Sequence, residues 1–246
     1  MTDYVGYFGE DVAARYDEPG GANDPAAIQP AVDLLAQLAE GGPVLELAIG
    51  TGRIAVPLHA RGLEVHGIDD SPAMLAKLRE RVGEAIPVTR GDMTTTRIAG
   101  QFALVYLVFN TINNLTTQDA QVACFENAAA HLRPGGCFVI EVGVPALQRL
   151  PPGQTVVPFD ISPGHFGFDV YDVVSQQFSS QHFFLDGRHI QPYPVPFRYV
   201  WPAELDLMAR IAGLRLRHRW ADWARSPFTA ISTKHVSVWH TPEATG

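Results

Sequence analysis

The sequence predicts an α/β fold: a mostly parallel seven-stranded sheet with helices on both faces, plus an antiparallel β insertion before the last helix–strand pair. Three observations lead to this prediction. Between residues 24 and 145, short apolar runs alternate with segments of helical periodicity, which is typical of a parallel sheet connected by helices. From 146 to 200 this alternation stops, and β-branched and aromatic residues favour antiparallel strands. Helical periodicity then returns at 202–214, followed by two more strand-like runs.

The elements can be assigned in chain order. Expected strands of the alternating region cover 43–49, 64–69, 86–92, 102–109 and 137–142. Expected helices between them cover 53–62, 71–82 and 116–132. The second helix has the clearest start, because Ser71 suits the N-cap and Pro72 the first helical position. The segment RPGG at 133–136 is expected to turn into the fifth strand, and Asp186–Gly187 to turn a hairpin in the insertion.

The composition limits the classes of partner. A net charge of −8 and a pI near 5.5 argue against nucleic acid, whose phosphates require clustered Lys and Arg. The basic stretch at 215–225 is expected to be a solvated strand edge. No run reaches the roughly 18 apolar residues of a membrane helix, and the start lacks the features of a signal peptide, so we expect a cytoplasmic protein without membrane contact. Cys124 and Cys137 match no metal-ligand pattern, so no metal site is expected.

The stretch VLELAIGTGR, residues 44–53, predicts a ligand site at the end of the first strand. Gly50 and Gly52 remove the side chains that would keep a ligand from the backbone. In an open parallel sheet, ligands bind at the carboxyl ends of the strands. Asp69 ends the next strand, nineteen residues after Gly50, and can accept hydrogen bonds from both hydroxyls of a ribose. Its alternative role as a helix N-cap is weaker, because Ser71 is better placed for it.

The remaining residues of this region restrict the class of ligand that the site can bind. The Gly-Lys-Ser/Thr of a phosphate-binding loop is missing, and Arg53 stands where a dinucleotide fingerprint has its last glycine. Glu46 favours a cationic ligand with an ammonium or sulfonium group, because a carboxylate at a strand end is costly without such a partner. Asp92 ends the third strand and could accept from an adenine amine, with the Met93 amide donating to the ring; alternatively, Asp92 is a plain turn residue.

On these residues the sequence resembles the class I S-adenosylmethionine-dependent methyltransferases. The resemblance covers about residues 10 to 145 and the last two strands, and depends on VLELAIGTGR, VHGIDDSPAML, RGDM, FALVYLVFNTINNL and HLRPGGCFVIEV. It implies a Rossmann-like sheet and the cofactor S-adenosyl-L-methionine. The chain departs from the family pattern at Ala48 and Ala103, where a glycine and an aspartate are common.

The resemblance also implies roles for individual residues. Glu46 would lie near the amino group of the cofactor and Arg53 near its carboxylate. Asp69 would bind the ribose, and Val108 and Phe109 would lie near the methyl group. The full expected cofactor set is Tyr16, Glu46, Ala48, Gly50, Gly52, Arg53, Asp69, Asp70, Met74, Asp92, Met93, Val108 and Phe109. The implied parts of a single domain are a lid at 1–23, the cofactor-binding core at 24–145, a substrate-side insertion at 146–200 and the closing helix and strands at 201–246.

Methyl transfer from a sulfonium is an in-line displacement that requires mainly alignment, so no catalytic triad is needed and none is visible. An amine acceptor must be unprotonated, whereas a hydroxyl acceptor profits from a general base. Candidate bases in the insertion are His165, His182, His189 and Tyr171, although a structural role is the stronger interpretation for each of them. The apolar and aromatic content predicts a small organic acceptor. We expect its reacting atom to be an O- or N-nucleophile, and we expect the protein to be a monomer or a homodimer.

Two other readings of the sequence remain open. The chain could be a non-catalytic module that binds S-adenosylmethionine, or a nicotinamide-dependent oxidoreductase with the same sheet. A large, partly aromatic cavity next to Phe109 would favour catalysis over mere binding.

Overall fold

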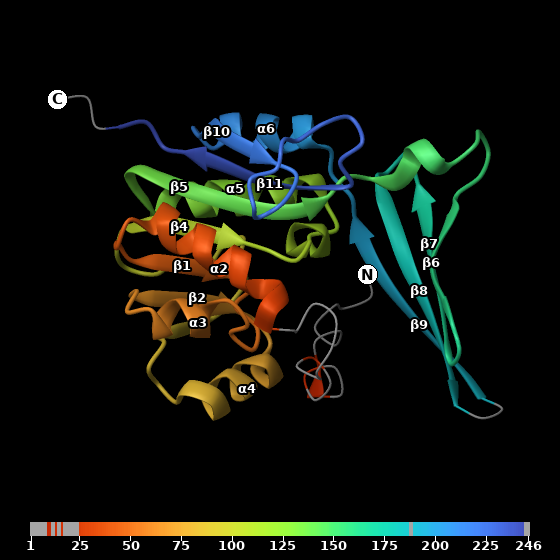
Figure 1. The fold of residues 1–246 in the computed structure, drawn as a ribbon, viewed down its shortest axis with the longest axis horizontal. Coiled ribbons are helices and arrows are strands. Elements are labelled where there is room, and N and C mark those ends of the chain that lie inside the picture. The colour runs from red at the N-terminus through yellow and green to blue at the C-terminus, as the bar shows by residue number, and fades with distance from the viewer. Residues whose placement is uncertain (1–8, 11–12, 14–15, 17–24, 187–188, 244–246) are drawn as a thin grey trace.

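The computed structural model describes residues 9, 10, 13, 16, 25–186 and 189–243. The expected lid at 1–23 therefore lies outside the described residues, except at four positions that include Tyr16. Figure 1 shows two parts: a main body built on a twisted sheet, and a second, smaller sheet beside it.

The sheet of the main body has seven strands. They are β1 (Val44–Leu47), β2 (Val65–Asp69), β3 (Val88–Arg90), β4 (Phe102–Leu107), β5 (Leu132–Gly143), β10 (Arg215–Trp220) and β11 (Lys234–His240). Their order is β10-β11-β5-β4-β1-β2-β3, and only β11 runs antiparallel to its neighbours. The order reverses between β1 and β4, so ligands are expected at the carboxyl ends of these strands.

Helices cover both faces of this sheet, as predicted (Figure 1). The helices α2 (Pro25–Ala39), α3 (Ala55–Ala60) and α4 (Pro72–Val82) pack on one face, and α5 (Gln118–His131) and α6 (Pro202–Ile211) on the other. Buried strands explain why the sequence shows continuous apolar runs rather than alternation, since both faces of each strand contact a core.

The middle strand β4 illustrates how the two cores are separated. Leu104 and Tyr106 pack into the core under α2 and α3, whereas Val105 and Leu107 pack into the core under α5 and α6. All four side chains are fully buried. Successive side chains of a strand point to opposite faces, so one apolar run supplies both cores.

Helix caps agree with the sequence prediction, whereas one strand start does not. The Ser71 hydroxyl accepts a hydrogen bond from the Met74 amide at 3.2 Å, and Thr117 caps α5 in the same way. The segment 133–136, predicted as a turn, is instead a bulge within β5: the partner of Phe102 is Leu132, but that of Leu104 is already Cys137. The step from Phe102 to Leu104 in β4 therefore lies opposite the longer stretch from Leu132 to Cys137 in β5. The ladder of backbone pairs is interrupted at this point.

The insertion forms a separate four-stranded antiparallel sheet. It contains β6 (Val156–Ser162), β7 (His165–Asp172), β8 (Gln177–Asp186) and β9 (His189–Arg198), in that order. Asp186 pairs with His189, so the hairpin turns where the sequence predicted it. The predicted fold class is confirmed.

Two short 3₁₀ helices complete the connections near the second sheet. The helix η3 (Thr111–Asn114) follows β4, and η4 (Ala146–Arg149) follows β5. The helix η3 lies against β9.

A buried polar cluster joins the second sheet to the main body. The guanidinium of Arg198, at the end of β9, donates to Glu204 at 2.7 Å and to Gln176 at 2.9 Å, and also to Gln121 of α5. Gln121 in turn donates to the carbonyls of Ile112 in η3 and of Arg198 itself. Arg198 is only 4% exposed, so its charge depends on these partners rather than on water.

Candidate functional site

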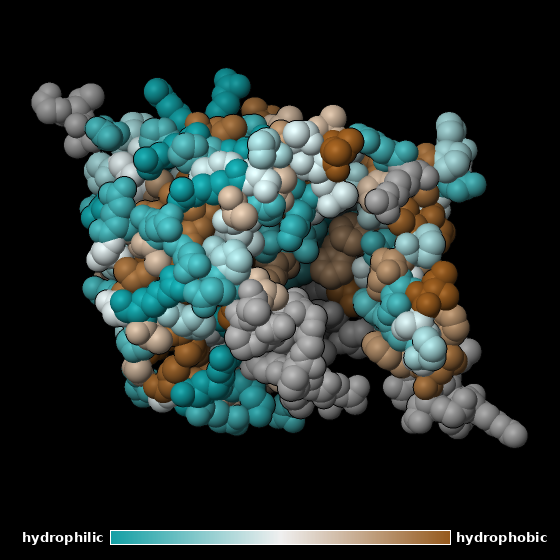
Figure 2. Space-filling view, in the orientation of Figure 1, coloured by the Kyte–Doolittle hydropathy of each residue, from teal (hydrophilic) through white to brown (hydrophobic). Residues whose placement is uncertain are grey.

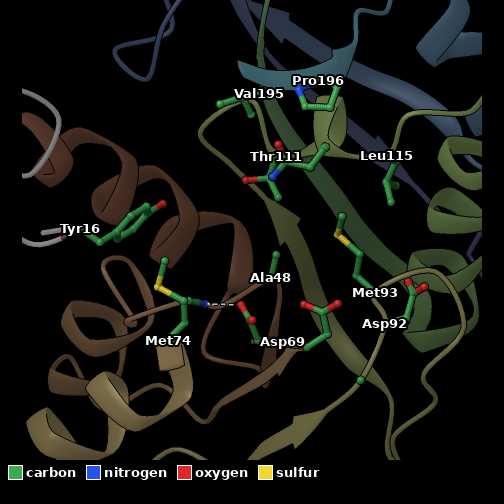
Figure 3. A pocket seen from close by; sticks show the side chains of 14 residues that line it. Tyr16, Ala48, Asp69, Met74, Asp92, Met93, Thr111, Leu115, Val195 and Pro196 are labelled. Atoms are coloured by element: carbon green, nitrogen blue, oxygen red, sulfur yellow. Dashed lines mark hydrogen bonds between the residues drawn. The ribbon is translucent and has the colours of Figure 1, made fainter. Parts of the chain in front are cut away.

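A cavity of about 200 Å³ opens at the carboxyl ends of the parallel strands. Figure 3 shows Asp69, Asp92 and Ala48 around it, with Tyr16 and Met74 on one side and Met93 and Leu115 on the other. The complete lining is Tyr16, Ala48, Gly50, Asp69, Asp70, Met74, Gly91, Asp92, Met93, Thr111, Asn114, Leu115, Val195 and Pro196.

The loop after β1 forms one edge of this cavity. Ala48, Gly50 and Gly52 all have left-handed backbone angles, with φ of 54°, 57° and 79°. A Cβ on Gly50 would meet no protein atom closer than 4.0 Å, whereas a Cβ on Gly52 would lie 2.4 Å from the Leu78 side chain of α4. Gly50 therefore leaves room toward the cavity, while Gly52 allows α4 to pack closely.

The two glycines should respond oppositely to alanine. Gly52→Ala is expected to destabilise the protein by about 2–4 kcal/mol, because overpacking adds to the strain of a left-handed alanine. Gly50→Ala is expected to cost only about 1–2 kcal/mol of strain but to reduce affinity for the expected cofactor more strongly than Gly52→Ala does. Thermal unfolding and calorimetric titration of both variants measure the two effects. Equal loss of stability and of affinity in both variants would contradict this assignment.

Asp69 links the glycine-rich loop to the end of β2. Its Oδ2 accepts from the Gly50 amide at 2.7 Å, and its Oδ1 accepts from the Ser71 amide at 2.8 Å. Burial raises the pKa of Asp69 above its usual value, while these two amides oppose the shift. Each carboxylate oxygen accepts one of these bonds and keeps a second lone pair for a ligand in the cavity.

The opposite edge of the cavity is the turn after β3. Asp92 Oδ1 accepts from both the amide and the hydroxyl of Thr94, at 2.7 Å each, so Asp92 stabilises the turn and also lines the cavity. Asn127 of α5 fixes the backbone of Met93, because its Nδ2 donates to the Met93 carbonyl at 2.7 Å. The sequence analysis missed Asn127, although a buried amide in an apolar helix is an available signal.

A small recess beside the cavity combines an acidic and a basic group. Glu46 is buried, and its Oε2 accepts from the Tyr106 hydroxyl at 2.9 Å. The Arg53 guanidinium lies between the rings of Tyr16 and Phe109, at 4.8 and 4.3 Å from their centroids. Among the described residues no partner accepts from the buried Arg53 Nε. A carboxylate and a guanidinium in one recess fit the zwitterionic end of an amino acid.

Burial raises the pKa of Glu46 to about 8, so folding favours its protonated form in the cofactor-free protein. The protonated Glu46 side chain therefore stabilises the folded state. This stabilisation is complete below pH 4.5, the ordinary pKa of a glutamate, and is lost as the pH rises toward 8, because Glu46 of the unfolded chain ionises first. Glu46→Gln is neutral throughout, so we expect its melting temperature to exceed that of the wild type at pH 8 by more than at pH 5. Thermal scans without cofactor between these pH values check this. A difference that does not change with pH would contradict it.

The backbone that follows β4 is strained where it borders the recess. Phe109 and Asn110 both have left-handed angles, with φ of 57° and 62°, so β4 ends at Leu107 rather than at the predicted residue 109. The carboxylate of Glu141 accepts from the Phe109 amide at 3.3 Å and from the Trp223 indole at 3.0 Å. Such backbone strain persists only where surrounding contacts enforce it, and it is typical of functional sites.

All but one of the residues expected to bind the cofactor line the cavity or the recess. Gly52 is the exception, for the packing reason given above. The residues in the recess are Tyr16, Glu46, Ala48, Ile49, Gly50, Thr51, Arg53, Val108, Phe109 and Thr111.

A second cavity, of about 460 Å³, lies between the main body and the second sheet. Figure 2 shows this region as a hollow with hydrophobic side chains at its back. Aromatic side chains of the second sheet and of the segment after it line one wall: Tyr171, Phe178, Phe197 and Tyr199. Three residues line both cavities: Tyr16, Thr111 and Asn114. Phe109 also lines the second cavity, so this cavity directly adjoins the recess.

Of the predicted candidate bases whose side chains the structure describes, only Tyr171 lines the second cavity. Tyr171 lines the second cavity, but burial raises the pKa of its phenol, which keeps it a donor. His165 and His182 are bonded to each other at 3.1 Å and do not line the cavity; His165 also contacts Asp160 at 2.5 Å. The side chain of His189 lies outside the described residues.

The sequence analysis missed Asp169 and Asn113, which both line the second cavity. The sequence offers one signal for Asp169, which lies two residues from Tyr171 and therefore on the same face of β7. It offers no comparable signal for Asn113.

Two negative findings apply to the described part of the chain. None of its helices has the length and apolar character needed to span a bilayer. Those same residues contain no group of three or more His, Cys, Asp or Glu side chains arranged to bind a metal.

Comparisons with known proteins agree with this geometry. Residues 44–136 match the family model described as a methyltransferase domain. The CcbJ methyltransferase from Streptomyces caelestis is 39% identical, with a TM-score of 0.84 over 96% of this chain and 98% of that one. The cypemycin N-terminal methyltransferase of a Streptomyces species is 27% identical over 203 residues, 81% of this chain and 83% of the relative. YqeM of Bacillus subtilis is 34% identical over 110 residues, which span only 44% of its length.

Proposed function

The chain belongs to the class I S-adenosylmethionine-dependent methyltransferases, and we propose that it transfers the methyl group of this cofactor to the nitrogen of a small organic amine. The observation that carries the proposal is the pair of adjoining cavities, which share Tyr16, Thr111 and Asn114 as a common wall. One cavity has the donors and acceptors that suit the cofactor, and the other has an aromatic wall that suits a small organic molecule.

The first cavity and the recess would hold the cofactor along their length. Asp69 would accept from the ribose hydroxyls, Asp92 and Met93 would contact the adenine, and Met74 would pack beside them. Glu46 would face the amino group, and Arg53 would face the carboxylate. The Arg53 Nε, which has no partner among the described residues, and the open space beside Gly50 support this orientation. When bound, S-adenosylmethionine supplies a methyl group that its sulfonium charge has already activated.

Nitrogen is favoured over oxygen by the groups in the second cavity. An aliphatic hydroxyl would need a strong general base. Burial raises the pKa of Tyr171, so its phenol stays protonated, and the two histidines lie outside the lining. The carboxylate of Asp169, which does line the cavity, is too weak a base to deprotonate an alcohol. An amine needs only to lose its extra proton before it attacks. The name of the related cypemycin N-terminal methyltransferase specifies the N-terminus as its target, which gives independent support for an amine acceptor.

Catalysis is favoured over a role in cofactor sensing. A module that only binds S-adenosylmethionine would not need an acceptor cavity. Here a cavity of about 460 Å³ adjoins Phe109 and the expected position of the methyl group. Its volume lies within the range of small-molecule sites, which is about 300–1,000 Å³.

The test has two stages. Calorimetric titration with S-adenosylmethionine and separately with NAD should show binding of the first only. The loaded protein is then incubated with a panel of primary and secondary amines and with the alcohols of matching carbon skeleton, and methylated products are identified by mass spectrometry. Products from amines support the proposal. Binding of NAD alone, or products from alcohols alone, would contradict it.

A further inference from the structure

Two hydrogen-bond acceptors, the side chains of Asp169 and Asn113, line the second cavity. Asp169 of β7 lines it, and its carboxylate already accepts from the Ser180 hydroxyl and, at 3.4 Å, from the Tyr171 hydroxyl. Asn113 of η3 lines it from the main body, and its Oδ1 is buried without a partner among the described residues. Asn113 as a whole is 8% exposed. A buried amide oxygen without a donor costs free energy, so a bound ligand that brings a donor would satisfy it.

Two acceptors in the lining of one cavity favour a ligand with more than one N–H group. A carboxylate accepts only, and it binds ammonium groups best when water is excluded. The surrounding rings of Tyr171, Phe178 and Phe197 are suited to a cation as well as to an apolar ring system. A neutral alcohol would offer only one donor and would leave one of the two acceptors unsatisfied.

We propose that Asp169 and Asn113 together bind the acceptor as a primary or secondary ammonium, and that Asp169 takes the proton that must leave before the nitrogen can react. This inference depends on the proposed function. The N–H bond breaks as an O–H bond forms on Asp169, which frees the nitrogen lone pair. The nitrogen then forms a bond to the methyl carbon as the bond between that carbon and sulfur breaks, which leaves a neutral thioether and a methylated ammonium.

The surroundings of Asp169 suit this role. Burial raises the pKa of its carboxyl group, while hydrogen bonds from Ser180 and Tyr171 and the nearby His182 act in the opposite direction. The raised pKa makes Asp169 a better proton acceptor than an exposed carboxylate. His182, which lies one row further along the same face of the sheet, has its own pKa lowered by burial and by His165. The lowered pKa favours the neutral imidazole of His182 over a competing cation.

The experiment uses two probes of matched size, cyclohexylamine and cyclohexanol, titrated into protein saturated with S-adenosylhomocysteine. Wild type is compared with Asp169→Asn, which keeps the shape of the side chain and can still accept from Ser180 through its one remaining oxygen. Asp172→Asn is the matched control, because Asp172 is exposed and lies on the opposite face of the same strand. A third variant, Asn113→Leu, removes the unpaired acceptor.

We expect the wild type and Asp172→Asn to bind the amine at least about tenfold more tightly than the alcohol. Asp169→Asn should lose this preference by lowering amine affinity alone, and Asn113→Leu should weaken amine binding more than alcohol binding. Equal affinity for both probes in the wild type, no amine binding at all, or an unchanged preference in Asp169→Asn would overturn the proposal. Retained binding of S-adenosylhomocysteine in the same titrations shows whether the cofactor assignment stands independently of that outcome.

Discussion

Replacing Asp69 by alanine is expected to lower the affinity for S-adenosylmethionine by at least about 100-fold. A hydrogen bond to a charged group contributes about 1.5–3 kcal/mol, and Asp69 is proposed to accept two from the ribose. The substitution also releases the Gly50 amide, which donates to Asp69 at 2.7 Å and fixes the glycine-rich loop. Calorimetric titration measures the loss, and thermal unfolding shows how much of it comes from a loosened loop.

Two further variants separate these contributions. Asp69→Asn keeps one oxygen acceptor and the side-chain volume, so it should retain more stability than alanine while still binding the cofactor weakly. Glu64 lies just before the opposite end of β2 and is exposed, so Glu64→Ala should leave affinity unchanged. Cofactor affinity within about threefold of wild type in Asp69→Ala would remove Asp69 from the site, because two charged hydrogen bonds cannot be lost so cheaply.

Arg198→Met is expected to destabilise the protein by about 3 kcal/mol, because it leaves the Glu204 carboxylate without its main partner. Although burial works against ionisation, hydrogen bonds from Arg198, Gln176 and Gln118 hold the pKa of Glu204 below its usual value. Removal of the Arg198 guanidinium takes away one of these hydrogen bonds and its positive charge, so burial is expected to raise the pKa of Glu204. For a chain of this length the melting temperature should fall by about 6–12 °C.

The matched comparison is the exposed ion pair between Arg61 and Asp33, at 2.5 Å. Arg61→Met should cost less than about 1 kcal/mol, because solvent screens that pair. The double variant Arg198→Met/Glu204→Gln should recover part of the loss, since no buried charge then lacks a partner. An Arg198→Met variant as stable as Arg61→Met would show that the cluster does not hold the second sheet in place.

The sequence predicted the parts of the structure that depend on local patterns. Apolar periodicity identified the strands, and Ser71 and Pro72 marked the start of α4 because capping depends on neighbouring residues alone. The position of the first cavity was predictable for a related reason: the carboxyl ends of parallel strands meet at one edge of the sheet, and Asp69 and Asp92 lie at two of these ends. The roles of the individual cofactor residues came from the family resemblance and stay a prediction.

Features that depend on tertiary packing were not predicted. Gly52 was assigned to the ligand, but its role follows from the distance to Leu78 on another helix. The bulge at 133–136 depends on the pairing of β5 with β4. Asp169 and Asn113 come from different parts of the chain and become neighbours of one cavity only when the insertion docks against η3. Alternation along β7 predicts that Asp169 and Tyr171 share a face, but not which face meets the main body.

The wall that the two cavities share has a thermodynamic consequence. Tyr16, Thr111 and Asn114 line both cavities, so the position that they adopt around a ligand in one cavity would set the space left for a ligand in the other. If bound cofactor changes the affinity for the acceptor by some factor, bound acceptor must change the affinity for the cofactor by the same factor, because the coupling free energy is reciprocal. A substitution in η3 that alters this coupling must therefore change both conditional affinities by the same factor, and neither ligand can be optimised independently of the other.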